Sequence, residues 1–575
     1  MISPSALPGV RSLASYQRSW LRSDVVAGLV LSTLLVPQGM AYAQLAGLPP
    51  ITGLYTTILC LLGYALFGPS RILVLGPDSS LGPMIAATIL PILGSNGSPE
   101  RAIALASILA LLVGAIMIVA GVAKLGFVAD LLSKPTQIGY MNGLALTILI
   151  GQLPKLFGFS TDASGLINET KAFLDGVSAG KTVGAAVAVG LFSLVLILAL
   201  ERWLPKIPGV LVAVVLAIAA SSVFNLADHG VDLVGTLPQG FPPLTVPHPV
   251  SDLPLLVAGA VGIALVALTD TISTASSFAA RTGQEVDGNG EMIGIGAANV
   301  AAGFFQGFPV STSGSRTAVA EQAGSKTQLT GVVGAAAIVL MLVLVPGLLK
   351  DLPQPTLAAI VIAASMSLAD IAGSVRLWRQ RRVEFLLMMT AFLGVALLGV
   401  LGGIAVAVAL SILNVFRRAW WPYQTTLGRV PGMSGYHDRQ LHPNAEQLPG
   451  LVLFRFDAPL FFANVRAFRD EIRRLIVADP PPRWIVIAAE PITDVDTTAA
   501  DMLEDLDEDL NAKGINLVFA ELKEPVRHKL ERYELIGPLD PEHFFPTIDA
   551  AITAFQTNTG AEWTAPAADG QGGPA

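Results

Sequence analysis

Apolar runs separated by short polar stretches fill the chain from residue 24 to residue 417. A helix needs roughly 20 apolar residues to cross a bilayer, and most of the runs approach that length. The pattern predicts fourteen membrane-spanning helices, near residues 24–45, 52–68, 79–93, 102–122, 136–152, 182–200, 208–224, 254–276, 291–306, 312–320, 329–346, 355–369, 384–400 and 402–417. The chain is therefore expected to be an α-helical polytopic membrane protein.

The third and tenth predicted helices are short, and each follows a polar interruption. The first interruption, Gly76–Pro83, reads Gly-Pro-Asp-Ser-Ser-Leu-Gly-Pro, and the second, Phe308–Thr317, reads Phe-Pro-Val-Ser-Thr-Ser-Gly-Ser-Arg-Thr. Irregular polar backbone at membrane depth is tolerated only where it is buried in protein or lines a wet cavity. Two such breaks at corresponding positions are a pointer to the binding site of a transporter.

A division into seven plus seven helices gives the two breaks matching positions in the two halves. Because seven is odd, the halves are inverted relative to one another. The N-termini of the two half-helices are then expected to face each other near the midplane. Free backbone N–H groups and the helix dipole favour an anion there.

Lysine and arginine residues predict the orientation of the helices. If the N-terminus is cytoplasmic, the cytoplasmic loops and ends carry Arg71, Lys124, Lys134, Arg202, Lys206, Arg281, Lys326, the cluster 376–382, Arg417 and Arg418. The opposite loops hold Arg101, Lys155, Lys171, Lys181 and Lys350. This bias predicts both termini inside, in a cell (inner) membrane.

Composition separates the membrane part from a soluble C-terminal part. The whole chain is 53% hydrophobic and 14% charged, against roughly 25% charged residues in soluble proteins. Residues 451–575 hold 22 of the 43 carboxylates and 11 of the 35 lysines and arginines. The acidic character therefore belongs to this C-terminal part.

Alternating strand and helix patterns in that part predict a small α/β domain. Strands are expected near 451–457, 484–489 and 515–520, and helices near 464–477, 498–512, 526–535 and 548–555. The expected organisation is an N-terminal segment 1–23, a transport domain 24–420, a linker 421–450, the α/β domain 451–557 and a disordered tail 558–575.

The sequence lacks the residue patterns that several kinds of functional site require. Cys60 is the single cysteine, and the six histidines are scattered, so neither a disulfide nor a metal cluster is indicated. The sequence has no phosphate-binding GxxxxGK[ST] loop and no basic tract typical of nucleic-acid binding. We expect neither an enzyme nor a cofactor.

Four motifs resemble those of the SulP sulfate permease family, also called solute carrier family 26. They are Pro-Ile-Thr-Gly-Leu-Tyr-Thr-Thr at 50–57 with Gly-Pro-Ser-Arg at 68–71, Val-Pro-Gln-Gly-Met-Ala-Tyr-Ala at 36–43, Ser-Arg-Thr at 315–317, and Thr-Asp-Val-Asp-Thr-Thr at 493–498. The last stands at the start of the second helix of a C-terminal STAS domain.

The resemblance implies a 7+7 inverted repeat, a core of helices 1–4 and 8–11, and a gate of helices 5–7 and 12–14. It also implies movement of the core against the gate, usually in a dimer. A cytoplasmic protein that binds the STAS domain is a further expected partner.

Candidate substrate residues lie on the first helix and at the first break. Gln38 and Tyr42 are four residues apart and share a helix face. The resemblance places them in the substrate cavity, although a buried Gln also joins helices. Ser79 and Ser80 offer hydroxyl groups to an oxyanion. Asp78 is protonated, points away, takes part in proton coupling, or caps the helix N-terminus.

The second break supplies Ser313, Gly314, Ser315 and Arg316, of which Arg316 is the nearest cation to the expected site. An intramembrane charge is expensive and is read as functional by default, with pairing to a carboxylate or carbonyl as the alternative.

Coupling-ion residues are expected on the eighth helix. Asp270 and Thr274 match an acidic residue and a hydroxyl that the resemblance implies for sodium coupling. A buried carboxylate also carries protons, and Asp270 as a structural partner of Arg316 is the third alternative. Glu291 is a secondary candidate, because it opens the ninth predicted helix and a carboxylate at that position stabilises the helix N-terminus without any further function.

In the STAS domain, Thr497 and Thr498 occupy the place of a phosphorylatable Ser in soluble relatives. Their alternative role, together with Asp496, is to cap a helix.

The leading functional hypothesis is a secondary active transporter of a small anion, with sulfate first. Bicarbonate, chloride, nitrate and dicarboxylates are alternatives within the family, and H+ or Na+ is the expected coupling ion. A membrane-anchored STAS signalling protein is the alternative from another functional class.

Overall fold

A computed structural model of the chain describes residues 8–9, 16–94, 97–126, 133–161, 163, 165–204, 207–246, 252–282, 286–477 and 480–564. The contacts divide it into two compact units, Met1–Ser411 and Ile412–Ala575. Parts of the predicted N-terminal segment (1–7 and 10–15), Lys206, the Arg281 side chain and residues 565–575 of the predicted tail lie outside the described residues.

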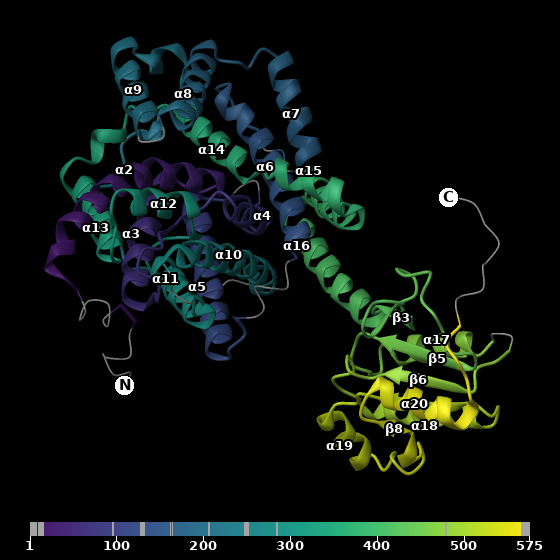
Figure 1. Ribbon diagram of the computed structural model, residues 1–575. Coiled ribbons are helices and arrows are strands. Elements are labelled where there is room, and N and C mark those ends of the chain that lie inside the picture. Colours follow the sequence, from purple (N-terminus) through teal and green to yellow (C-terminus); the bar gives the residue numbers. More distant parts are fainter. Residues whose placement is uncertain are drawn as a thin grey trace. The chain divides into compact units, whose positions relative to one another are not determined.

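The first unit has a helix at each of the fourteen predicted positions (Figure 1). They are α2 (Leu21–Leu45), α3 (Pro50–Phe67), α4 (Gly82–Leu93), α5 (Pro99–Val122), α6 (Lys134–Leu156), α8 (Gly184–Trp203), α9 (Gly209–Phe224), α10 (Leu253–Thr282), α11 (Gly288–Phe304), α12 (Gly314–Gln322), α13 (Leu329–Leu344), α14 (Gln354–Leu368) and the two halves of α16 (Arg382–Trp420). The predicted polytopic helical fold is confirmed.

Length and composition make seven of the described helical stretches able to cross a membrane, and α4, α9 and α13 are shorter apolar helices. The long α16 contains Gly399 with φ 78° and ψ 176°, a backbone conformation that favours glycine. This break separates the thirteenth and fourteenth predicted helices.

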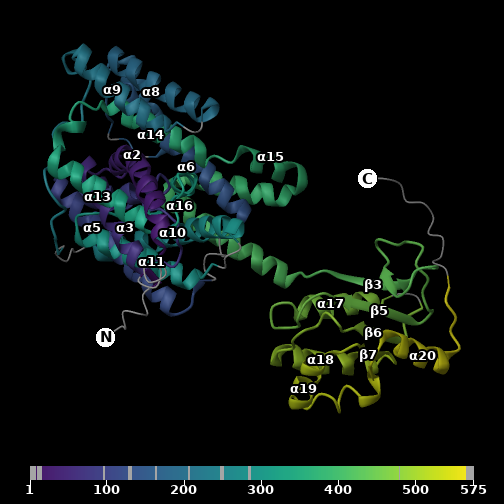
Figure 2. The same cartoon turned by 60° about the vertical axis from the view of Figure 1, so that its left-hand side comes forward.

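Two amphipathic helices were not predicted. They are α7 (Leu166–Ser178) and α15 (Ile371–Gln380). Each is shorter than a membrane span and contains polar residues, so neither forms a long apolar run in the sequence. Helix α15 follows α14 and precedes α16 (Figure 2).

The membrane helices pack as two groups. In the first, which we call the core group, α11 packs on α3 and α5, α13 packs on α2 and α3, and α10 packs on α4 and α5. In the second, the gate group, α14 packs on α6, α8 and α9, and α16 meets α6 where Gly139 lies against Met388. The groups meet where α2 contacts α9 and α14.

The two polar breaks are joined by backbone pairing. Strand β1 (Leu75–Gly76) is antiparallel to β2 (Ser311–Thr312), with Leu75 opposite Thr312 and Gly76 opposite Ser311. Val74 extends the junction, since its carbonyl accepts from Ser313 N at 3.1 Å and its N–H donates to Thr317 Oγ1 at 3.1 Å. The half-helices α4 and α12 begin just after these strands.

The second unit contains a six-stranded sheet of order β4-β3-β5-β6-β7-β8. Its elements are β3 (Gln424–Arg429), β4 (Tyr436–Asp438), β5 (Leu451–Phe456), α17 (Val465–Leu475), β6 (Trp484–Ala488), α18 (Thr497–Asn511), β7 (Asn516–Ala520), α19 (Glu524–Arg532), β8 (Phe544–Phe545) and α20 (Ile548–Thr559). Strands β5 to β8 are parallel, and β3 is antiparallel to both of its neighbours. The predicted α/β domain is confirmed.

The stretch 421–450 is not a bare linker, because β3 and β4 form one edge of this sheet. Their shortness and the surrounding proline and glycine residues concealed them in the sequence. At the other end, α20 continues to Thr559, and residues 561–564 are described, with Thr564 bridged to Gln447.

Candidate functional site

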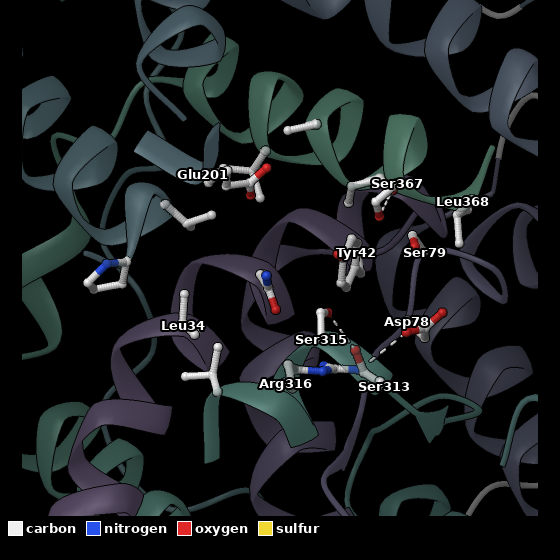
Figure 3. A pocket seen from close by; sticks show the side chains of 18 of the residues that line it. Leu34, Tyr42, Asp78, Ser79, Glu201, Ser313, Ser315, Arg316, Ser367 and Leu368 are labelled. Atoms are coloured by element: carbon white, nitrogen blue, oxygen red, sulfur yellow. Dashed lines mark hydrogen bonds and ion pairs between the residues drawn. The ribbon is translucent and has the colours of Figure 1, made fainter. Parts of the chain in front are cut away.

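A cavity of about 1170 Å³ lies in the first unit, between the core and gate groups (Figure 3). Its wall combines α2, α10, α12 and the turn before α4 with residues of α8, α9 and α14. All but one of the predicted membrane site residues line it: Gln38, Tyr42, Asp78, Ser79, Asp270, Thr274, Ser313, Gly314, Ser315 and Arg316. The exception is Ser80, which is 1% exposed and lies behind the wall.

Helix α2 brings Gln38 and Tyr42 to the cavity on one face. Tyr42 is 5% exposed, and Figure 3 shows it close to the Ser79 side chain from the first break. Gln38 therefore offers an amide, and Tyr42 and Ser79 offer hydroxyl groups, to a molecule in the cavity.

Asp78 lies at the start of the turn that precedes α4. Its Oδ1 accepts from Ser80 N at 2.9 Å and from Ser80 Oγ at 2.8 Å. Asp78 is not the N-cap residue of α4, which begins at Gly82 after Leu81; it caps the turn that leads into this helix, since its carbonyl also accepts from Gly82 N at 3.2 Å. The helix begins three residues later than predicted, so the carboxylate shapes the turn instead.

Arg316 is the buried cation of the site. Its side chain is 1% exposed, and Nη2 lies 3.4 Å from Asp78 Oδ2. The Nε and Nη1 atoms have no hydrogen-bond partner in the part of the chain that the structure describes. A carboxylate partner for Arg316 was one alternative, and the partner is Asp78 rather than Asp270. The hydroxyls of Ser313 and Ser315 lie beside it, 3.1 Å apart.

Asp270, on α10, is linked to Asp78 through one hydroxyl. Ser80 Oγ lies 3.0 Å from Asp270 Oδ2 and 2.8 Å from Asp78 Oδ1. A serine hydroxyl carries a single hydrogen, which the two carboxyl groups share. The Ser80 hydroxyl therefore joins Asp270 to the turn that holds Asp78.

Thr274 lies one helical turn after Asp270 on α10 and also lines the cavity. Among the described residues, no group of three or more His, Cys, Asp or Glu side chains is arranged to hold a metal ion. A sodium ion beside Asp270 would therefore need hydroxyl and carbonyl oxygen atoms to complete its set of ligands.

Glu291 lies outside the cavity wall. It is 1% exposed and accepts from Tyr64 OH at 2.6 Å and from Ser70 Oγ. Gln328 holds the same loop, since its Nε2 donates to the carbonyls of Ser70 and Leu73 at 2.9 Å each. Glu291 therefore fixes the segment that leads into β1.

Several cavity residues were not predicted as site residues, namely Glu201, Ser273, Thr312, Gln322 and Ser367. Glu201 is the notable one, because it adds a carboxylate to the wall from the end of α8. It lies beside Arg202, in a stretch where the apolar pattern predicts a loop.

Thr497 and Thr498 lie in the second unit, exposed at the start of α18. Asp496 caps this helix, since its Oδ1 accepts from Ala499 N at 2.8 Å. The capping role predicted for Asp496 is therefore present, and phosphorylation of the threonines stays a prediction.

The profile of the sulfate permease family matches residues 21–391, and that of the STAS domain matches residues 442–551. A protein of Mycobacterium tuberculosis strain H37Rv, named probable sulfate transporter, is 42% identical over 560 residues, which cover 97% of this chain and 99% of that one. Sulfate transporter 1.1 of Arabidopsis thaliana is 29% identical and covers 94% of this chain, with 87% of its own length matched.

Solved structures agree with these matches. The murine solute carrier 26 family member A9 anion transporter, in an inward-facing state, superposes with a TM-score of 0.87 at 25% identity, over 96% of this chain and 94% of that one. The transmembrane domain of a cyanobacterium bicarbonate transporter, BicA, shares the fold with a TM-score of 0.60 at 21% identity, over 69% of this chain and 98% of that one. The chain belongs to the sulfate permease family of anion transporters and carries a STAS domain after its membrane unit.

Proposed function

We propose that this chain is a secondary active transporter of small oxyanions, with sulfate as its first substrate. One observation carries the proposal. The half-helices α4 and α12 begin beside the same cavity, and Arg316 adds a buried cation with two unpartnered nitrogen atoms. Helix N-termini and guanidinium groups both favour oxyanions.

The hydroxyl groups around the cavity support an oxyanion rather than an apolar ligand. Ser79, Ser313 and Ser315 line the wall with Tyr42. Neutral donors of this kind recognise the oxygen atoms of sulfate without adding charge. The named substrate of the mycobacterial and plant relatives supports sulfate as the specific choice.

The charges at the site support coupling to a proton. Arg316 faces Asp78, so their charges largely cancel, and an ionised Asp270 would leave the site negative. A negative site repels a dianion. Protonation of Asp270 removes that charge, so anion and proton favour each other's binding. Sodium near Asp270 and Thr274 is the competing coupling ion.

The division into two helix groups supports elevator-like alternating access as the mechanism. The half-helices and their joined strands belong to the core group, whereas α6, α8, α9, α14 and α16 form the gate group. Movement of the core group against the gate group would carry the anion with it. The inverted repeat and the homodimer belong to the same proposal.

The test is uptake of labelled sulfate by the purified full-length chain in proteoliposomes, with proton and sodium gradients imposed separately. We expect sulfate uptake that an inward proton gradient accelerates and that Arg316→Gln abolishes. Arg101→Gln is the matched control, because Arg101 is exposed at the start of α5. Robust bicarbonate flux without sulfate flux would refute sulfate as the substrate. Acceleration of uptake by a sodium gradient alone would refute the proton as the coupling ion.

A further inference from the structure

Helix α15 lies between two membrane-crossing helices and is anchored firmly at its start. Asp370 caps it, with Oδ1 accepting from Gly373 N at 2.7 Å. Asn142 of α6 binds both sides of the junction, since its Oδ1 accepts from Asp370 N at 2.7 Å and its Nδ2 donates to Ser374 Oγ at 2.9 Å. A ten-residue amphipathic helix is too short to cross a bilayer, so the membrane surface is the place expected for it.

One face of α15 is packed, and a second is apolar yet exposed. Gly373 and Leu377 are buried. Ile371, Val375 and Trp378 are 65%, 44% and 56% exposed. The spacing of four and then three residues puts these three side chains on one helix face. Trp378 also packs edge-on against Phe385 of α16, with ring centres 4.9 Å apart, and the rest of this face is exposed.

A third face carries cations. Arg376 and Arg379 are exposed, and no carboxylate of the described residues pairs with either. Arg382 follows at the start of α16, with its guanidinium 6.0 Å from the centre of the Trp378 ring. Glu384, the next acidic residue after α15, pairs with Arg381 at 3.3 Å. The arginines on α15 are therefore left for an external anion.

We propose that α15 is a docking site for anionic phospholipids of the membrane leaflet on its side. Ile371, Val375 and Trp378 enter the boundary of the acyl chains, and Arg376 and Arg379 bind the phosphate groups of the lipid headgroups. Tryptophan prefers this interfacial depth, and surface arginines attract anionic headgroups. An acidic protein segment would satisfy the arginines but would leave the apolar face in water, so lipid fits both faces.

The orientation of the helix is tested by site-directed fluorescence. Cys60 is the single cysteine and is fully buried, so the unmodified chain serves as the unlabelled background. A polarity-sensitive dye is attached to Val375→Cys or, as the matched control, to Gln380→Cys on the opposite side of α15, in the full-length chain in liposomes. We expect lipids spin-labelled high on the acyl chain to quench only the dye at 375, and iodide to quench mainly the dye at 380. Equal iodide quenching at both positions would overturn the proposal.

Headgroup selectivity is tested by thermal unfolding of the full-length chain in neutral phosphatidylcholine nanodiscs, to which phosphatidylglycerol is added. We expect a rise in melting temperature that depends on phosphatidylglycerol. Each surface arginine contributes about fivefold in affinity for an anionic membrane, so Arg376→Gln/Arg379→Gln should need about 25-fold more phosphatidylglycerol. Arg466→Gln/Arg532→Gln, which removes two exposed arginines of the STAS domain, should behave as the unmodified chain.

Two outcomes of this second experiment would overturn the proposal. One is an equal response of both double variants to phosphatidylglycerol. The other is the same stabilisation by inorganic phosphate in neutral nanodiscs, since that would identify a site for a free anion rather than for lipid.

Discussion

A single methyl group at residue 76 is expected to disable the anion site without unfolding the protein. In Gly76→Ala, the new Cβ would lie 2.6 Å from Nη1 and 3.3 Å from Cζ of Arg316. Strand β1 is held to β2 by backbone pairing, so residue 76 has little freedom to retreat. The guanidinium is the end of a long side chain, so it is the part that moves.

The size of the movement follows from ordinary contact distances. Non-bonded heavy atoms prefer roughly 3.5 Å or more, so Nη1 must shift by about 1 Å. Arg316 lines the cavity, so a displaced guanidinium leaves its present place in the site, and its contact with Asp78 is already 3.4 Å long. Overpacking of this kind typically costs about 1–3 kcal/mol of stability. A displacement of about 1 Å in a binding group is enough to lower a rate about 100-fold.

The assay is initial sulfate uptake in proteoliposomes, combined with melting temperature in detergent. Gly262→Ala is the matched control, since it lies on membrane helix α10 and its new Cβ would meet only Met84 Cε at 3.8 Å and Leu401 Cδ2 at 3.9 Å. We expect Gly76→Ala to fold with a modestly lower melting temperature and to lose nearly all uptake. We expect Gly262→Ala to retain both.

A double variant separates displacement of Arg316 from general damage. Lysine lacks the guanidinium fork, so Arg316→Lys already removes the group that Gly76→Ala displaces. The two substitutions should therefore be non-additive, with uptake by the double variant close to that of Arg316→Lys alone. Unchanged uptake in Gly76→Ala would refute the role of the guanidinium position, and fully additive losses would refute the proposed route of the effect.

Three further predictions concern carboxyl groups. Asp270→Asn should retain sulfate exchange but lose the acceleration of uptake by an inward proton gradient. A gradient of one pH unit is a tenfold difference in proton concentration, so uptake measured at two external pH values tests this prediction. Acceleration that persists in the variant would contradict it. Glu201→Gln removes a negative charge from the cavity wall and should lower the KM for sulfate roughly threefold, as expected for a through-water interaction with a dianion; a raised KM would contradict it. In the STAS domain, burial raises the pKa of Asp507, and His543 partly offsets this rise. Because the folded state favours the protonated carboxyl group, the contribution of Asp507 to stability falls as the pH rises through that raised pKa. Asp507→Asn keeps an oxygen acceptor for Asn511 Nδ2. Compared with the unmodified chain, it should protect the amides of α18 more strongly from hydrogen exchange at neutral pH and equally in acid. The same gain in protection at both pH values would refute the assignment of the effect to the Asp507 charge.

Most helices of the membrane unit could be predicted because a helix that crosses the bilayer needs a long run of apolar residues. The half-helices were also predictable, since proline, glycine and serine interrupt otherwise apolar sequence. Their starts were less accurate: α4 begins at Gly82 rather than near residue 79. The reason is local, because the Asp78 side chain forms a turn with Ser80 before the helix begins.

The pairings within the site could not be predicted, because they join residues far apart in sequence. Asp78 and Arg316 are 238 residues apart, and Ser80 and Asp270 are 190 residues apart. Their proximity depends on the pairing of β1 with β2, and two-residue strands leave no periodic pattern to read. Glu201 was missed for a related reason: its place in the cavity wall depends on how α8 packs against α14, not on its neighbours in sequence.

The pairing of β1 with β2 also bears on how an anion would be carried. A site made from two independent half-helices would lose its geometry if either helix moved alone. Here the strands before α4 and α12 are joined by backbone hydrogen bonds, and the ion pair between Asp78 and Arg316 spans the same junction. Displacing one half-helix would break these contacts within a protein interior, where unpaired polar groups are costly. We infer that the two half-helices move as one body, so the proposed anion site would keep its shape while the core group moves against the gate group.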